Sequence, residues 1–259
     1  MGKVYATADW HGCGAVANKV FEYLKPEDTL YFLGDAIDRG PDGIELVQKL
    51  MNRPNTIFIM GNHEEMLDRT FISYKGQWID WDNTNINLWT YNGGKPTMKA
   101  LSMLPKEEVI KIMQFIRECP KQNITYKSPN GHKVFLEHAG YTPYVNMHKH
   151  DPLWDRTHFN DHWTGLDDTF IVHGHTPVQY LLFDFGFNGA DGFPHDEEFF
   201  EKKRLWEEDA ICDKPTILRY CDGHKFDVDM CTIVTNRIAL LDLDTFEEIY
   251  FDAEEDKND

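Results

Sequence analysis

The first 70 residues alternate between short apolar runs and longer amphipathic stretches. Three apolar runs predict strands, because each is short and ends at a turn-forming residue; they cover 4–8, 30–33 and 56–60. Two stretches, 15–24 and 43–51, repeat apolar residues at helical spacing, and a third helix is predicted to open near Glu64. Strands alternating with helices at this spacing indicate right-handed crossovers and a parallel sheet.

From 70 to 123 the pattern predicts mainly helices, the clearest at 106–119. The buried stripe of that helix is expected to consist of Val109, Ile112, Met113 and Ile116. Further strands are predicted at 124–127, 133–137 and 169–172. The Asn130-Gly131 pair predicts a hairpin between the first two of these, and the C-terminal stretch predicts a last hairpin turning near Asp244-Thr245.

These elements predict an α/β protein in which residues 1–259 form a single domain, long enough to bury a sizeable core. Residues 184–215 interrupt the pattern, because they are acidic and aromatic and rich in glycine at first. We interpret them as an insertion or lid with a short helix around 197–208. The last residues are expected to form a solvated tail.

The formal net charge of −18 disfavours binding to a nucleic-acid duplex or to an anionic membrane. The five cysteines are odd in number and lack C-x-x-C spacing, which argues against a disulfide framework or a zinc ribbon. The N-terminus shows no apolar core of a signal peptide, and no apolar run is long enough to span a membrane. We therefore expect a soluble, cytoplasmic monomer.

Polar residues of a few types follow the predicted strands where each strand ends. In "GDAIDRG", Asp35, Asp38 and Arg39 follow the second strand. The other strand ends carry Asp9 and His11, Asn62 and His63, His138, and His173 and His175. The carboxyl ends of the strands in an open α/β sheet share one edge, where ligands bind. Residues from 9 to 175 can therefore meet in space.

This set offers carboxylate, amide and imidazole ligands without a thiolate, and it is too large for one ion and suited to two. Mixed oxygen and nitrogen ligands favour Mn²⁺, with Fe, Zn²⁺ or Mg²⁺ as alternatives. Two-metal sites with ions ~3.5–4 Å apart serve in-line phosphoryl displacement. Two bound ions would also make the site locally cationic within an acidic protein.

The motifs "ADWHG", "GDAIDRG", "GNHE", "HAG" and "HGHTP", in this order, resemble those of PPP-type phosphoprotein phosphatases. These belong to the calcineurin-like metallophosphoesterase superfamily. The bacterial and phage branch and its symmetrical diadenosine tetraphosphatase relatives are the most similar, and "LWTYNGGKPT" and "LWDR" also resemble segments of that branch. The resemblance implies a central β-sandwich flanked by helices, with a dinuclear metal site at the carboxyl ends of the strands.

The resemblance also implies a role for each residue that matches a motif. Asp9, His11 and Asp35 would hold the first metal, and Asp35, Asn62, His138 and His175 the second. His63 would be the general acid, oriented by Asp38, and Arg39 and Arg156, with Asn62, would bind the substrate phosphate. The sequence departs from the family at Ala8, where glycine is usual, and the segment 184–215 matches no family segment.

Two further features have plainer interpretations. Glu64 is expected to serve the N-terminus of its helix, where a carboxylate is favoured. His148, His150, His158 and His162 are close in sequence, but no predicted strand presents them together. We interpret them as a solvated loop and not as a third metal site.

The function that these features indicate is hydrolysis of phosphoserine and phosphothreonine in proteins, with phosphotyrosine or small phosphorylated molecules as further substrates. A metal-bound hydroxide would attack phosphorus directly, because the chain shows no cysteine nucleophile motif. Symmetrical hydrolysis of diadenosine tetraphosphate is the alternative, since it would use the same residues. A binding module that has lost catalysis would show a broken ligand set, and a nuclease would not suit the acidic charge.

Overall fold

The computed structural model describes residues 2–74, 77–82, 84–143, 150–180 and 214–253. It contains two five-stranded mixed sheets. In the first, three parallel strands form one side and two antiparallel strands the other; in the second, three parallel strands form the centre and an antiparallel strand lies at each edge. The first sheet, in the order β12-β11-β1-β2-β3, consists of β1 (Val4–Thr7), β2 (Thr29–Phe32), β3 (Thr56–Phe58), β11 (Arg237–Asp242) and β12 (Glu248–Asp252). The second, in the order β6-β7-β8-β10-β9, consists of β6 (Ile124–Lys127), β7 (Lys133–Leu136), β8 (Thr169–His173), β9 (Leu218–Tyr220) and β10 (Lys225–Asp227).

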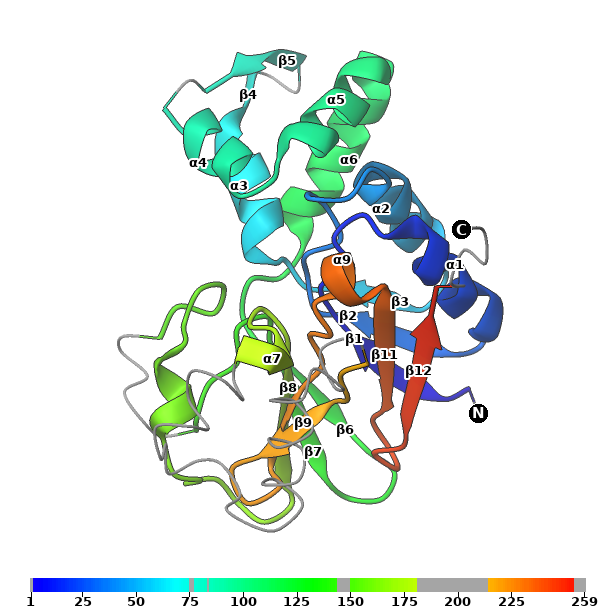
Figure 1. Ribbon diagram of the computed structural model, residues 1–259, viewed down its shortest axis with the longest axis vertical. Helices are drawn as coiled ribbons and strands as arrows, with labels where there is room; N and C mark the ends of the chain where they lie inside the picture. Colours follow the sequence, from blue (N-terminus) through cyan, green and yellow to red (C-terminus); the bar gives the residue numbers. More distant parts are fainter. Residues whose placement is uncertain (1, 75–76, 83, 144–149, 181–213, 254–259) are drawn as a thin grey trace, which may run out of the picture.

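Helices cover one face of the first sheet and extend beyond it at one end (Figure 1). They are α1 (Gly14–Tyr23), α2 (Gly43–Asn52), α3 (Asn62–Thr70), α4 (Ile86–Tyr91), α5 (Lys95–Met103) and α6 (Lys106–Glu118). Shorter helical turns follow at η1 (Thr157–Asn160), α7 (Val178–Tyr180) and α9 (Thr232–Thr235). The lobe formed by α3 to α6 and the second sheet lie at opposite ends of the molecule (Figure 1).

The buried apolar side chains form two clusters, one under the helices and one between the two sheets. Successive residues of a strand alternate between the two clusters. In β11, Ile238 and Leu240 belong to the cluster under the helices, whereas Ala239 and Leu241 belong to the cluster between the sheets. Val134 and Leu136 of β7 reach the latter cluster from the second sheet. The two sheets therefore pack face to face, and the predicted β-sandwich flanked by helices is confirmed.

Most predicted elements are present within one or two residues of their expected ends. The Asn130-Gly131 turn connects β6 to β7 with Gly131 at a φ of 96°, a conformation that glycine adopts without strain. The last hairpin, β11–β12, turns at Asp244-Thr245. The buried stripe of α6 is the one that its spacing predicts.

The prediction that 70–123 is mainly helical is wrong at its start. A two-stranded sheet, β4 (Phe71–Tyr74) paired with β5 (Gln77–Trp81), lies between α3 and α4. The aromatic and β-branched residues of "FISYKGQWIDW" favour this conformation. β9 was also not predicted. Most of the predicted insertion at 184–215, with its helix at 197–208, lies outside the described residues.

The interpretation of all four histidines as a solvated loop is wrong for His158, which is only 2% exposed. His158 Nε2 lies 2.9 Å from the Ala139 carbonyl and donates to it, so Nδ1 is free to accept from Lys225 Nζ at 3.0 Å. Lys225 of β10 is fully buried and also donates to the Thr142 hydroxyl. This network fixes the segment between β7 and β8, which carries Arg156, to the second sheet.

Burial lowers the pKa of Lys225 from 10.5 to about 8. Between these pH values the unfolded chain binds more protons than the folded one, so rising pH stabilises the fold. We expect the free energy of unfolding of the wild type to gain about 1.4 kcal/mol per pH unit there, relative to Lys225→Met. Denaturant titrations of the wild type and of Lys225→Met at several pH values in this range test the expected difference in the free energy of unfolding. Parallel pH profiles would show that Lys225 titrates at its ordinary pKa.

Candidate metal centre and active site

The predicted site residues come together where the loops after β1, β2, β3, β7 and β8 meet. Two groups of side chains have their ligand atoms within 4.8 Å of one another: His11, Asp35 and His63, and Asp35, His138 and His175. All five side chains are buried. Asp35 belongs to both groups, as the predicted bridging position requires.

The two oxygens of Asp35 face different groups. Oδ2 lies 3.7 Å from His11 Nε2, whereas Oδ1 lies 3.6 Å from His138 Nε2. Asp9 extends the first group, with Oδ1 4.0 Å from His11 Nε2. Asn62 joins the second group, because its Oδ1 lies 3.0 Å from His138 Nε2 and 3.2 Å from His175 Nδ1. The six predicted ligands therefore form one continuous cluster.

The backbone of the site is strained. Six of its non-glycine residues have φ in the left-handed region: Asp9 (57°), His11 (41°), Asp35 (62°), Asp38 (70°), Arg39 (64°) and His175 (70°). Such conformations cost of order 1–3 kcal/mol each and persist only where the surroundings impose them. Backbone hydrogen bonds between the β1 and β2 loops impose them here, from Asp9 N to Gly34 O and from His11 N to Asp35 O, both at 3.0 Å.

Glu64 has a larger role than the predicted one at the start of α3. Its carboxylate accepts from Gly61 N at 3.0 Å, which caps the helix as expected. It also accepts from Asp35 N at 2.8 Å and from Ala36 N at 3.0 Å, and it is fully buried. Glu64 therefore ties the loop that carries Asp35 to the helix that carries Asn62.

Two glycines allow close approach to the ligand carboxylates. A Cβ atom at Gly61 would collide with Asp35 Oδ1, and one at Gly174 would collide with Asp9 Oδ2. The glycines of "GNHE" and "HGH" thus leave the space in which these carboxylates lie.

The donor atoms suit divalent cations. Burial lowers the pKa of His11, His138 and His175 below the ordinary value, which keeps the imidazoles neutral as metal binding requires. Asp9 Oδ1 and His175 Nε2 are buried and have no hydrogen-bond partner among the described residues. Buried polar atoms of native proteins are normally satisfied, so these two point to a ligand. The residues fit a pair of divalent ions with mixed oxygen and nitrogen ligands.

His63 and Asp38 form a buried pair beside the ligand cluster. His63 Nδ1 lies 2.7 Å from Asp38 Oδ2, which directs Nε2 toward the Asp35 carboxylate, 3.9 Å away. Burial alone would lower the pKa of His63, but the charge of Asp35 and the hydrogen bond to Asp38 raise it above its ordinary value. The hydrogen bond to Asp38 uses the Nδ1 proton and leaves Nε2 as the atom that faces the ligand cluster.

Asp38 is held by two residues to which the sequence analysis gave no role. Trp89 Nε1 donates to Asp38 Oδ2 at 2.9 Å, and the Thr97 hydroxyl donates to Oδ1 at 2.6 Å. Both belong to "LWTYNGGKPT". The resemblance of this segment to the family was the available signal, and the structure shows that it buttresses the His63–Asp38 pair from α4 and α5.

The two arginines are the exposed members of the site. Arg39 lies 2.9 Å from His11 Nε2 through Nη1 and 3.2 Å from His63 Nε2 through Nη2. Arg156 Nε donates to the Thr176 hydroxyl at 3.0 Å, which places it beside His175. The guanidinium groups thus approach the cluster from two sides, a geometry suited to phosphate oxygens.

Asp229 is a further buried carboxylate that the sequence analysis missed. It follows β10, so it occupies a strand end like the ligands do. Burial raises the pKa of Asp9 well above its ordinary value, and the charge of Asp229 raises it further. This repulsion between carboxylates favours the binding of cations at the cluster.

Comparison with known proteins agrees with the geometry. The family model described as calcineurin-like phosphoesterase matches residues 2–225. The chain is 28% identical over 201 residues to an asymmetrical bis(5'-nucleosyl)-tetraphosphatase, PrpE, of Halalkalibacterium halodurans, with 66% of this chain and 77% of the relative covered. It is 28% identical over 191 residues to serine/threonine-protein phosphatase 2 of Salmonella typhimurium, with 68% and 81% covered.

Among solved structures, the chain resembles one of a putative diadenosine tetraphosphatase, with a TM-score of 0.54 and 16% identity over 96% of this chain and 92% of the other. At this identity the similarity concerns the fold alone. No helix among the described residues combines the length and apolar character that crossing a bilayer requires. The match over most of the sequence shows that the chain belongs to the calcineurin-like phosphoesterase family, whose members are hydrolases that use divalent metal ions.

Proposed function

We propose that this chain hydrolyses phosphomonoesters on serine and threonine residues of proteins. The observation that carries the proposal is the placement of the His63–Asp38 pair and two arginines around ligand groups that share Asp35. Phosphoryl transfer to water needs bound cations, an adjacent proton donor and guanidinium groups that stabilise the charge of the phosphate.

We infer that the ligands divide between two ions as the family pattern implies. Asp9, His11 and Asp35 would hold one ion, and Asp35, Asn62, His138 and His175 the other. Two divalent ions bound there supply charge neutralisation for the phosphate and acidify a water molecule. We propose Mn²⁺ as the metal, because the ligand set lacks sulfur.

The other residues bind the substrate and move a proton. Arg39 and Arg156 would clamp the phosphate oxygens from two sides of the cluster, with the Asn62 amide beside them. His63 would donate the Nε2 proton to the leaving oxygen, because Asp38 accepts from Nδ1 and the pKa of the imidazole is raised.

A protein substrate is supported by the similarity to serine/threonine-protein phosphatase 2 and by the exposure of both arginines. A phosphate carried on a polypeptide can reach guanidinium groups that lie at the surface. The second candidate is a dinucleoside tetraphosphate. Trp154, 36% exposed, is held by a 3.0 Å hydrogen bond to Glu65 and lies 6.0 Å from the His175 ring. Its indole offers a nucleobase an aromatic surface beside the cluster.

Phosphate release by the Mn²⁺-loaded protein from phosphoserine, phosphothreonine and phosphotyrosine peptides, compared with diadenosine tetraphosphate, tests the proposal. We expect the phosphoserine and phosphothreonine peptides to give the highest kcat/KM. A higher kcat/KM for the dinucleotide than for the peptides would contradict the proposed protein substrate. The products of the dinucleotide reaction would then show whether cleavage is symmetrical. In that case Trp154→Leu should lower kcat/KM for the dinucleotide and leave that for a small aryl phosphate unchanged.

A further inference from the structure

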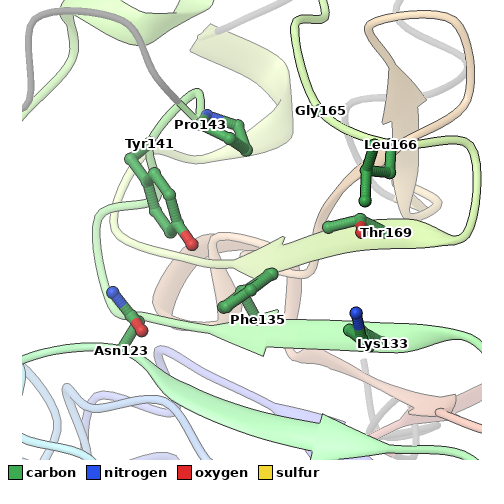
Figure 2. A pocket seen from close by; sticks show the side chains of 8 residues that line it. All are labelled: Asn123, Lys133, Phe135, Tyr141, Pro143, Gly165, Leu166 and Thr169. Carbon is green, nitrogen blue, oxygen red and sulfur yellow. The ribbon is translucent and has the colours of Figure 1, made fainter.

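A second candidate binding site lies on the outer face of the second sheet, away from the ligand cluster. A cavity of about 260 Å³ opens there between β7, the start of β8 and the segment that connects them. Its walls are formed by Asn123, Lys133, Phe135, Tyr141, Pro143, Gly165, Leu166 and Thr169 (Figure 2). None of these residues belongs to the metal centre.

The pleat of β7 produces the floor of this cavity. Val134 and Leu136 are buried between the two sheets, so Lys133 and Phe135 face the other way. Figure 2 shows the Phe135 ring on the floor, with Tyr141 and Leu166 on opposite walls. The rings of Phe135 and Tyr141 meet edge to face at 6.1 Å, and Leu166 is 59% exposed. The cavity therefore presents apolar walls of a size that admits one large side chain.

Two lysines lie side by side at the same face. Lys127 of β6 is directly opposite Lys133 of β7 in the sheet register. Like charges directly opposite each other in a sheet are destabilising. Neither ammonium group has a carboxylate of the described residues within 4.0 Å, although the chain carries a net charge of −18. A cationic pair that no described carboxylate neutralises suits an anionic partner.

We propose that this cavity docks an extended peptide segment in which a large apolar side chain enters between Phe135, Tyr141 and Leu166 and neighbouring carboxylates reach Lys127 and Lys133. Burying such a side chain removes apolar surface from water, which is enough for a weak docking contact. That the peptide belongs to a phosphorylated substrate rests on the proposed phosphatase function.

Docking would act on substrate recruitment and not on chemistry. Tyr141 follows the predicted ligand His138 by three residues, so one wall of the cavity belongs to the loop that carries this ligand. A substrate held there presents its phosphate to the site at a raised effective concentration. Because the contact is the same in the ground state and the transition state, it lowers KM and leaves kcat unchanged.

The first test is direct binding to the Mn²⁺-loaded protein. The probe is a short fluorescein-labelled peptide in which phenylalanine is followed by glutamates, with control probes that carry alanine for phenylalanine or lysines for the glutamates. We expect Leu166→Asp and Lys133→Glu each to raise the Kd of the probe about tenfold or more. Two matched substitutions at exposed positions, Met103→Asp on α5 and Lys111→Glu on α6, should leave it unchanged.

Equal affinity for the alanine probe, or unchanged affinity in Leu166→Asp and Lys133→Glu, would overturn the proposal. It would also be overturned if adenosine monophosphate bound instead with the same dependence on these two residues, since the cavity would then be a nucleotide site.

A second test joins the same sequence to a phosphoserine. Leu166→Asp should raise KM for this peptide about tenfold and leave kcat and the hydrolysis of a small aryl phosphate unchanged. Probe binding without turnover of the phosphopeptide would contradict only the proposed protein phosphatase function. Turnover with the same KM in wild type and variant would contradict only the docking site.

Discussion

Replacing Asp35 by asparagine should abolish the binding of two ions and reduce phosphatase activity by at least about 10³-fold, equivalent to roughly 4 kcal/mol. The two carboxylate oxygens face different ligand groups, at 3.7 Å from His11 Nε2 and 3.6 Å from His138 Nε2. An amide keeps one oxygen and directs an N–H group toward the other cation. The backbone contact from His63 N to Asp35 Oδ1, 3.0 Å, can persist, so the fold should survive.

The measurement is metal content by mass spectrometry beside kcat for a small aryl phosphate, with circular dichroism to show that the variant is folded. Asp167→Asn, at an exposed position between η1 and β8, is the matched control and should behave as the wild type. An active Asp35→Asn protein that retains both ions would exclude the bridging role.

Substitution of His63 by asparagine should lower kcat by about 10²–10⁴-fold while both ions remain bound. The variant lacks the imidazole that Asp38 orients at 2.7 Å, but the six predicted ligands are intact. The loss should depend on the leaving group. An ester of 4-nitrophenol leaves readily without a proton, so its hydrolysis should suffer least, whereas phenyl phosphate should suffer the full loss.

Rates for a series of aryl phosphates, measured with the wild type and the variant at equal metal content, give this dependence. An identical loss for every leaving group would mean that His63 does not donate the proton. Asp38→Asn offers a second test, because it leaves His63 in place and removes one of the two carboxylates that raise its pKa, the other being Asp35. It should show the same dependence on the leaving group with a smaller loss.

The sequence predicts much of the fold because its strongest signals are local. The parallel strands β1, β2 and β3 and the helices between them follow from apolar runs and helical spacing within a few residues. The β4–β5 pair was missed, because its two short strands lie between segments with strong helical patterns, although their aromatic and β-branched residues favour strands. β9 has only three residues, Leu218–Tyr220, which is too short for a periodic pattern.

The clustering of the candidate ligands was predictable, because Asp9, Asp35 and His138 are polar residues that follow predicted strands. The side chains that hold the site residues in place were not predictable. Trp89 and Thr97 reach Asp38 across 51 and 59 positions of sequence, and no local pattern connects them. His158 was misjudged for the same reason, since its burial depends on Lys225, 67 positions away. Tertiary contacts of this kind become visible only in the folded chain.

The central claim is that one carboxylate joins two cation sites in this chain. Electron paramagnetic resonance of the protein during titration with Mn²⁺ tests it most directly, because ions ~3.5–4 Å apart interact magnetically. We predict that a second equivalent of Mn²⁺ produces the spectrum of a coupled pair in the wild type, and that Asp35→Asn never does. Saturation at one ion, or two ions with independent spectra in the wild type, would contradict the account.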